Sequence, residues 1–583
     1  MKKAQKEFKP ISYLKNYKFL SFCVPLLKGL EAVTEIFIPL LMANIVDVGI
    51  KTNNVSYIWK NSIFILALNI VAIVCAIVSQ KCTAKVVEGM SKDMRKDIFF
   101  HINTLSHAEL DKFSTTSLLN RTVHDVYHIK MGTASLLRTT IRIPFLLIGS
   151  LVMALRINLK MSLIFIVVCP VLIFTVLAIM KKINPLIESS KTKLDNTSKI
   201  TREGLTGVRV IRAFNKQSFE EERFNKSNED LVSTQLSLGT WSAVLIPAIY
   251  TIINFAIVAI LYFGGVEVNV GEMTQGNLLA FINYFSQIAT SLVVIARLIT
   301  IYTRMITSTN RINEVFDLKN SIENPKKPVA IDLENENISR VEFKNVSFSY
   351  NNVKNALNEL SFVAEPGETI GIIGGTGSGK SSLINLIPRF YECTKGSVFI
   401  GDKNVKKYDI EDLRKIISIV PQNPTLFSGT IKSNLLWRNP SATNEELIKA
   451  LKISQSFSFV KEYPEFLDYK VNKGGTNFSG GQKQRLTIAR ALVGNPKILI
   501  LDDSTSALDF ATDAKLRKAI KKIKNLTTFI VTQRTNSIKD ADKIIVLDSG
   551  NVVGIGTHEE LLTNCLVYSE IHYSQNKEGN KNG

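Results

Sequence analysis

Long apolar runs alternate with charged stretches over the first half of this 583-residue chain. A helix needs about 20 mainly apolar residues to cross a bilayer. Six runs approach or exceed this length, and the second continues directly into an amphipathic stretch. The pattern therefore predicts six membrane-spanning helices, near residues 19–46, 61–80, 138–157, 159–180, 243–264 and 276–300.

The connections between these runs differ in length and charge. Two are long, helical in pattern and rich in Lys and Arg, at residues 81–137 and 181–240, whereas the last one, at 266–272, is short and acidic. Basic connections favour the cytoplasmic side of a membrane. We therefore predict a multi-pass protein of the cell membrane, with both termini, both long connections and any domain after the last span in the cytoplasm. The basic first ten residues lack an apolar run with a cleavage site, so no cleaved signal peptide is expected.

The pattern changes near residue 340. Residues 306–340 mix Asn, Glu, Lys and Pro, which is typical of a linker, and from Val341 short β-branched runs alternate with helical stretches. This alternation indicates an α/β domain. The predicted fold is multidomain, an all-α six-helix transmembrane domain followed by an α/β domain. The predicted boundaries are 1–318 for the transmembrane domain, 319–340 for the linker, 341–573 for the α/β domain and 574–583 for a disordered tail.

Composition supports the membrane interpretation. Hydrophobic residues make up 45% of the chain and charged residues 21%, with a formal net charge of +20. Such a charge suits either nucleic acid or a membrane surface, and its concentration between alternate apolar runs favours the membrane. We expect membrane lipid and no nucleic acid among the partners. The six scattered cysteines form no CxxC pair and are expected to be reduced thiols.

A glycine-rich loop with the pattern of a P-loop lies in the second domain. It follows the buried-strand pattern of residues 369–373, and a helix is predicted to begin at Ser382. Backbone N–H groups in such a loop cradle phosphate oxygens, the lysine ammonium reaches the β and γ phosphates, and the serine hydroxyl ligates Mg²⁺. The second domain is therefore predicted to be a P-loop nucleotide-binding domain. Its predicted ATP-binding residues in this region are Gly374, Gly375, Thr376, Gly377, Ser378, Gly379, Lys380, Ser381 and Ser382.

A second apolar strand pattern, residues 498–501, ends at Asp502, whose carboxylate is placed to hold Mg²⁺. The sequence Ser479-Gly-Gly-Gln482 precedes it by about twenty residues. In this order and spacing, the P-loop, this signature and the acidic strand end resemble the nucleotide-binding domain of an ABC transporter. Together with six predicted spans, they resemble an exporter-type half-transporter, in which a membrane domain is fused to an ATPase domain.

The resemblance implies roles for further residues. Tyr350 resembles the aromatic residue that stacks on adenine, although an ordinary strand tyrosine is the alternative. Gln422 resembles the glutamine that touches Mg²⁺, so that the implied cofactors are ATP and Mg²⁺ and the implied metal ligands are Ser381, Gln422 and Asp502. Residues 506–509 resemble the loop at the dimer interface. The signature residues implied to cap the γ-phosphate of ATP bound to the other subunit are Ser479, Gly480, Gly481 and Gln482.

The membrane half carries a resemblance of its own. Residues 117–125 and 204–214 resemble the cytoplasmic turns through which exporters of this family hold their ATPase domains, although a solvated helical turn is the alternative for either one.

Two catalytic positions depart from the family pattern. Asp503 stands where the family usually has Glu, and Gln533 stands where it usually has His. An aspartate carboxylate falls about 1.5 Å short of a glutamate carboxylate, and glutamine cannot relay a proton as histidine can. Lys473, just before the signature, replaces a commonly acidic residue. We therefore predict weak hydrolysis at this chain's own P-loop, with neutral drift in a working ATPase as the alternative.

An intact signature beside a weakened catalytic pair suggests division of labour. The favoured hypothesis is a heterodimer in which a second ABC half-transporter hydrolyses most of the ATP and the cargo consists of drugs or other amphipathic molecules, by family analogy alone. A homodimer with slow hydrolysis at both sites is one alternative. An ATP-binding regulatory or gating membrane module is another.

Three charged residues lie inside the first apolar run. Lys28, Glu31 and Glu35 share one helix face. Charges at membrane depth usually face a bundle interior or a water-filled cavity. One hypothesis is that Glu31 and Glu35 line the translocation cavity and favour cationic cargo. The alternative is a structural ion pair near the cytoplasmic end of the span.

Overall fold

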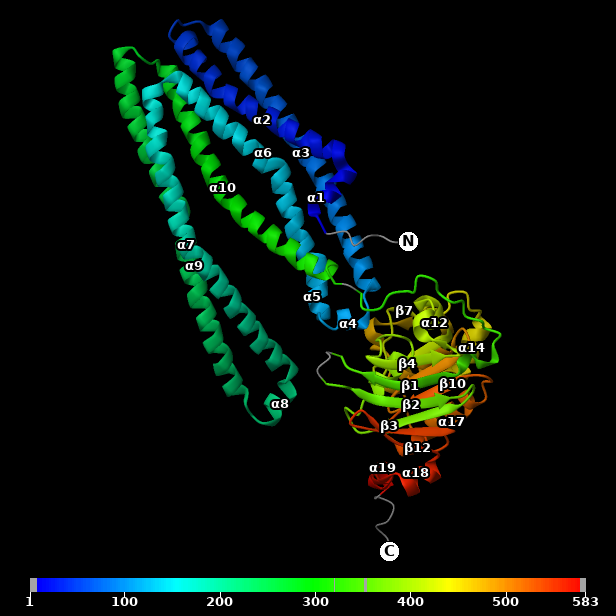
Figure 1. The fold of residues 1–583 in the computed structure, drawn as a ribbon. Helices are drawn as coiled ribbons and strands as arrows, with labels where there is room; N and C mark the ends of the chain where they lie inside the picture. The colour runs from blue at the N-terminus through cyan, green and yellow to red at the C-terminus, as the bar shows by residue number, and fades with distance from the viewer. Residues whose placement is uncertain (1–7, 319, 351–353, 577–583) are drawn as a thin grey trace. The chain divides into compact units, whose positions relative to one another are not determined.

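The computed structural model describes residues 8–318, 320–350 and 354–576. The chain folds as two compact units, the first formed by Met1–Asn103 and Ser114–Leu318 and the second by Thr104–Phe113 and Lys319–Gly583. The first unit is helical, and the second is built around β-sheets (Figure 1).

Among the described residues of the first unit, six long helical stretches are apolar enough to cross a membrane, so the six predicted spans are confirmed. Their helices run well past the predicted apolar runs, because the long basic connections continue them without a break. At 1.5 Å per residue, the 50 residues of α3 extend roughly 75 Å, against about 30 Å of bilayer core. The helices of this unit, with α4 assigned to the second, are α1 (Pro10–Tyr13), α2 (Lys18–Asn44), α3 (Val55–Thr104), α5 (Thr115–Asn120), α6 (Val126–Ile157), α7 (Leu159–Thr206), α8 (Val208–Ala213), α9 (Gln217–Val270) and α10 (Gln275–Phe316).

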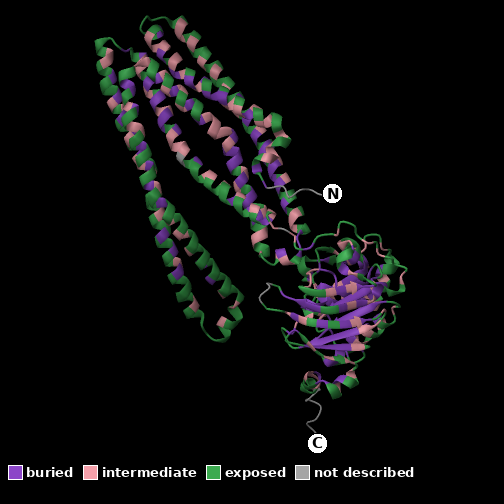
Figure 2. Cartoon of the chain, in the orientation of Figure 1, coloured by how far each residue is buried: buried purple, intermediate pink, exposed green. Residues whose placement is uncertain are grey.

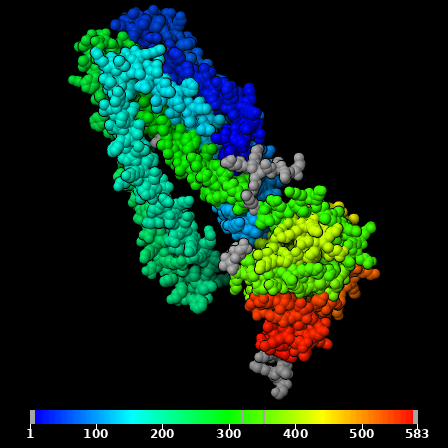
Figure 3. Space-filling view, in the orientation of Figure 1, coloured from blue at the N-terminus to red at the C-terminus, as the bar shows by residue number. Residues whose placement is uncertain are grey.

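Within this unit, α2, α6 and α10 pack together, and α7 lies against α9. The α7–α9 pair runs side by side and extends beyond the other helices of the unit (Figure 3). Tyr284 and Phe281 of α10 are fully buried in the bundle, and the Tyr284 hydroxyl donates to the Ile36 carbonyl at 2.8 Å. Many large apolar residues of these helices are exposed. Figure 2 shows exposed positions along the helices of this unit. This exposure suits helices whose surroundings are lipid rather than water.

The second unit contains a six-stranded sheet in the order β12-β11-β3-β10-β9-β6. All neighbouring strands in it are parallel except the β11–β12 pair. A separate antiparallel sheet has the order β2-β1-β4-β5, and β7 pairs with β8. The strands are β1 (Val341–Phe348), β2 (Leu357–Ala364), β3 (Thr369–Gly374), β4 (Lys395–Ile400), β5 (Lys403–Asn404), β6 (Ile417–Val420), β7 (Gly429–Thr430), β8 (Lys470–Val471), β9 (Ile498–Asp502), β10 (Thr527–Val531), β11 (Lys543–Asp548) and β12 (Asn551–Gly556).

The six-stranded sheet is buried on both faces. Along β9, Ile498 and Ile500 join one apolar core, whereas Leu499 and Leu501 join the other. Successive side chains of a strand point to opposite faces, so a strand covered on both sides reads as an unbroken apolar run. The helices of this unit are α4 (His107–Leu110), α11 (Lys380–Leu386), α12 (Ile410–Ile416), α13 (Ile431–Leu435), α14 (Asn444–Ile453), α15 (Phe457–Val460), α16 (Gly480–Leu492), α17 (Phe510–Lys521), α18 (His558–Asn564) and α19 (Leu566–Asn576).

Helix α19 corrects one predicted boundary. It runs to Asn576, three residues into the segment 574–583 that the sequence suggested was disordered, and residues 577–583 lie outside the described part of the chain. The helix is held because the Gln575 side chain bonds to the loop after β10, donating to the Gln533 carbonyl at 2.6 Å and accepting from the Thr535 amide at 3.0 Å.

Candidate functional site

The glycine-rich loop joins β3 to α11 and is shaped by two residues with left-handed backbone. Gly377 has φ +80° and Gly379 has φ +101°. A Cβ on Gly379 would lie 2.6 Å from the Ala356 carbonyl oxygen, whereas a Cβ on Gly375 or Gly377 would meet nothing within 4 Å. One side of the loop is therefore packed against the chain, and its other side is open to a ligand.

Lys380, the first residue of α11, lies folded over this loop. Its Nζ donates to the carbonyl oxygens of Gly374 at 2.8 Å and Gly375 at 2.7 Å. Burial lowers the pKa of Lys380, and the nearby charges of Asp503 and Asp502 act in the opposite direction. An anionic ligand on the open side of the loop would favour the charged form of this lysine, as phosphate does.

Strand β9 ends at Asp502, whose carboxylate lies beside the start of α11. The Ser381 hydroxyl donates to Asp502 Oδ2 at 3.3 Å. Burial raises the pKa of Asp502, the hydrogen bond from Ser381 lowers it, and the charge of Asp503 raises it further. A divalent cation at this pair would offset the cost of keeping the carboxylate ionised.

These oxygen donors fit Mg²⁺. In nucleotide sites, Mg²⁺ binds one or two protein oxygens and completes its octahedron with phosphate and water. The described residues contain no cluster of three or more His, Cys, Asp or Glu side chains able to hold a metal. Ser381 and Asp502 therefore suit a cation that is also coordinated by the phosphates of a bound nucleotide, rather than a metal coordinated by protein side chains alone.

Asp503 follows directly, with a left-handed backbone at φ +44°. Its amide donates to the Val531 carbonyl at 2.9 Å, and its Oδ2 accepts from Gln422 Nε2 at 3.3 Å. Burial raises the pKa of Asp503, whereas the Gln422 hydrogen bond and the charges of Arg534 and Lys380 oppose the shift. Parallel pairing of β3, β10 and β9 brings their carboxyl ends to one edge, so the structure places Lys380, Ser381, Gln422, Asp502 and Asp503 together.

Gln533 lies in the loop after β10, at the same edge of the sheet, and is exposed. Its backbone carbonyl is held by Gln575 of α19, which restrains the loop without occupying the Gln533 side chain. The contact with α19 was not foreseen, since a polar tail of the chain carries no pattern that indicates its target.

Tyr350 lies beside the loop's helix, where its hydroxyl and the Ser382 hydroxyl are 3.0 Å apart. Its ring meets Phe348 and Tyr391 edge-on and remains 49% exposed. This position suits the adenine-stacking role, and it equally suits a strand tyrosine packed on its neighbours.

The signature forms the start of α16. Ser479 is the N-cap, its hydroxyl accepting from the Gln482 amide at 3.3 Å while Gln482 Oε1 accepts from the Ser479 amide at 2.9 Å. This capping box leaves Ser479 and Gly480 exposed. A Cβ on Gly480 would meet nothing within 4 Å, and one on Gly481 would lie 3.2 Å from the Ala507 carbonyl oxygen. The signature and the 506–509 loop thus form one accessible surface.

A segment that the sequence prediction overlooked is Thr104–Phe113, which folds with the second unit. Within it, His107 stacks on Phe390 with 4.3 Å between ring centroids. The Tyr391 hydroxyl donates to Asp111 at 2.5 Å. The predicted turns at 117–125 and 204–214 lie in the first unit, in α5 with the π-helical turn after it and around α8.

This fold and site define a membrane-spanning protein with a P-loop ATPase domain. A family model described as the ABC transporter transmembrane region matches residues 21–292, and one described as ABC transporter matches residues 357–506. The chain belongs to the ABC transporter family, with the exporter-type arrangement of a membrane domain fused to an ATPase domain.

Several relatives match over nearly the whole chain. An uncharacterized ABC transporter ATP-binding protein of Bacillus subtilis is 35% identical over 97% of this chain and 98% of its own length. A putative multidrug export ATP-binding/permease protein of Bacillus subtilis is 31% identical, with 97% and 98% covered. An ATP-dependent lipid A-core flippase of Colwellia psychrerythraea is 28% identical, with 97% and 95% covered.

Among solved structures, a bacterial Atm1-family ABC exporter with ATP bound matches with a TM-score of 0.81 and 21% identity, over 98% of this chain and 99% of that one. This match shows the exporter fold.

Proposed function

We propose that this chain is one half of a heterodimeric ABC exporter and that its own P-loop site binds ATP but hydrolyses it slowly. The observation that carries the proposal is the catalytic pair. Asp503 has a shorter side chain than glutamate, and its carboxylate accepts a hydrogen bond from Gln422. Gln533 stands where a proton-relaying histidine is usual.

The roles of the binding residues follow from their chemistry. The backbone N–H groups of Gly377, Gly379 and Lys380 cradle the phosphates, and the Lys380 ammonium leaves its two carbonyl partners to meet the β and γ phosphates. Ser381 and Asp502, with Gln422 beside them, hold Mg²⁺, which screens the phosphate charge. Tyr350 stacks on the adenine.

The asymmetry arises because each ATP is bound between one chain's P-loop and the other chain's signature. Ser479 to Gln482 match the signature and have an exposed N-cap and a glycine pair. A second ABC half-transporter with Glu and His at the catalytic positions would then hydrolyse most of the ATP, completed by this chain's signature.

The cargo is proposed to be amphipathic. The relatives' names include a lipid A-core flippase and a putative multidrug exporter, and both lipids and drugs combine apolar and polar parts. The basic connections support a cytoplasmic location for both termini and the ATPase domain. The exporter-type arrangement of the chain supports outward transport.

ATPase measurements on the purified chain test the asymmetry. A working general base contributes about 10²–10⁴-fold to the rate. We expect slow hydrolysis by the wild-type chain and a loss on Asp503→Asn far smaller than about 10²-fold, because Asp503 is a poor base. ATP binding, measured separately with a fluorescent ATP analogue, should be retained in both.

Robust hydrolysis that Asp503→Asn abolishes would contradict the slow-site proposal and favour the homodimer. The regulatory module predicts no ATP-driven accumulation of a drug in vesicles that carry both halves, whereas the exporter predicts uphill accumulation.

Coupling between ATP hydrolysis and transport is proposed to pass through α4. Replacing Tyr391 by Phe removes the hydroxyl that donates to Asp111 and leaves the ring in place. A hydrogen bond to a charged group contributes about 1.5–3 kcal/mol, and less where it is exposed, as here. We expect up to about a tenfold loss in drug transported per ATP hydrolysed, with basal hydrolysis unchanged. Tyr573→Phe, at an exposed tyrosine of α19, is the matched control. Equal transport ratios in the wild type and Tyr391→Phe would exclude this role.

A further inference from the structure

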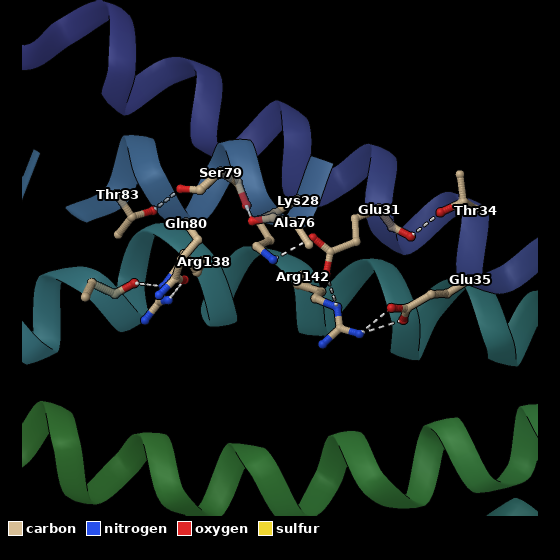
Figure 4. A network of polar contacts seen from close by, with 11 residues as sticks. Lys28, Glu31, Thr34, Glu35, Ala76, Ser79, Gln80, Thr83, Arg138 and Arg142 are labelled. Atoms are coloured by element: carbon tan, nitrogen blue, oxygen red, sulfur yellow. Dashed lines mark hydrogen bonds and ion pairs between the residues drawn. The ribbon is translucent and has the colours of Figure 1, made fainter. Parts of the chain in front are cut away.

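The two glutamates of the first span are already paired. Glu31 is 7% exposed, and its carboxylate accepts from Lys28 Nζ at 2.5 Å. Arg142 of α6 donates from Nη2 to both carboxylate oxygens of Glu35 at 2.6 Å (Figure 4). Arg142 Nε also lies 3.6 Å from Glu31 Oε1. Glu35 lines a cavity, as one hypothesis expected. A cationic cargo would have to displace Lys28 or Arg142, so the arrangement that the structure shows is the structural ion pair.

A cavity of about 490 Å³ lies beside this network, between α2, α6 and α10. Its α10 wall is neutral, and two of its hydroxyls bond to their own helix. Ser286 donates to Ile282 O at 2.9 Å, and Thr290 donates to Ser286 O at 2.8 Å. Ile143, Leu146 and Val294 add apolar surface. The charge of the cavity is therefore decided by its ionisable residues alone.

Arg138 supplies the positive charge that the carboxylates beside the cavity do not balance. It lies one helical turn before Arg142 on α6 and lines the cavity. Its partners are the neutral oxygens of Gln80, bonded through Nη1, and of Ala134, bonded through Nε at 3.4 Å (Figure 4). In the described part of the chain, no carboxylate forms an ion pair with Arg138. Three cations, Lys28, Arg138 and Arg142, thus face two carboxylates, and one positive charge remains on the wall.

We infer that this cavity binds an amphipathic molecule with an anionic head group, which Arg138 holds while the apolar part lies on Ile143 and Leu146. An uncompensated cation in surroundings of low dielectric attracts an anion far more strongly than it would in water. The inference rests on the proposed exporter function, since it names the class of cargo.

Binding to the full-length chain in phosphatidylcholine nanodiscs without nucleotide tests the inference. Two probes share one dansyl-tagged dodecyl chain and end in sulfonate or in trimethylammonium, with signal from empty nanodiscs subtracted. We expect the sulfonate to bind about tenfold more tightly, which corresponds to about 1.4 kcal/mol. Arg138→Gln should remove this preference and Arg138→Lys should retain most of it. Arg156→Gln, at an exposed arginine of the same helix outside the cavity, should leave it unchanged.

A second set of binding measurements distinguishes a lipid head group from a non-lipid anion as the ligand. Phosphatidylglycerol added to the nanodiscs displaces the sulfonate probe if lipid head groups are the ligand, and leaves it bound if the ligand is a non-lipid anion. Either result keeps the inference. Equal binding of the two probes, preference for the cation, or a preference that survives Arg138→Gln would overturn it. Since no ATP is present, a failure of ATP-driven transport with probe preference intact would count against the proposed function alone.

Discussion

Replacing Gly379 by Val is expected to weaken ATP binding severely. Gly379 has φ +101°, and its Cβ would lie 2.6 Å from the Ala356 carbonyl oxygen and 2.8 Å from a Leu357 methyl group. A side chain in such a backbone region costs about 1–3 kcal/mol before any clash is counted, and a backbone carbonyl cannot move aside cheaply. The loop must therefore change shape, which withdraws the N–H groups and shifts Lys380, the next residue.

We expect ATP affinity to fall by about 100-fold or more, equivalent to about 2.8 kcal/mol. Titration with a fluorescent ATP analogue measures the loss. The matched control is Gly367→Val, because Gly367 also has a left-handed backbone, at φ +84°, with nothing within 4 Å of its Cβ. The control should lower the midpoint of thermal unfolding and leave ATP affinity unchanged. Normal ATP affinity in Gly379→Val would contradict the assignment of this loop to the phosphates.

The parts of the protein that the sequence predicted well are those coded by local pattern. Six apolar runs predicted six spans, since length and hydropathy are read from consecutive residues. The P-loop was placed between a strand and a helix because its glycines and Lys380 are close in the chain. Strand β9 was found as an apolar run ending in Asp502, since both faces of its sheet are covered.

What the sequence did not predict depends on contacts between distant residues. Arg142 pairs with Glu35 across 107 positions, so the first span alone could not decide between a cavity-lining role and an ion pair for its glutamates. The four-residue α4 is too short for a periodic pattern, and its partners Phe390 and Tyr391 lie some 280 positions further on. The left-handed backbone of Asp503 was also not predicted, because aspartate adopts both left-handed and ordinary backbone conformations and its presence does not indicate which one.

The second large effect is a gain of activity. Asp503→Glu combined with Gln533→His is expected to raise ATP hydrolysis by the purified chain by about 10²-fold or more, within the range that a positioned base supplies. Glutamate extends the carboxylate by about 1.5 Å, and histidine restores a group that can relay a proton. The intact Ser479–Gln482 signature lets a second copy complete the site, so the chain can be assayed by itself.

The single variants separate the two contributions. Asp503→Glu should give most of the gain, because the base acts directly on the attacking water, and Gln533→His alone should give little, since residues of one catalytic unit do not contribute additively. Glutamate is less favoured than aspartate at φ +44°, so a slightly lower midpoint of thermal unfolding is expected for both variants that carry it. Asp503→Asn keeps a residue suited to that backbone and serves as the control that lacks a carboxylate. If the double variant binds ATP normally yet hydrolyses no faster than the wild type, Asp503 and Gln533 do not limit the rate, and the asymmetry has to originate elsewhere in the site.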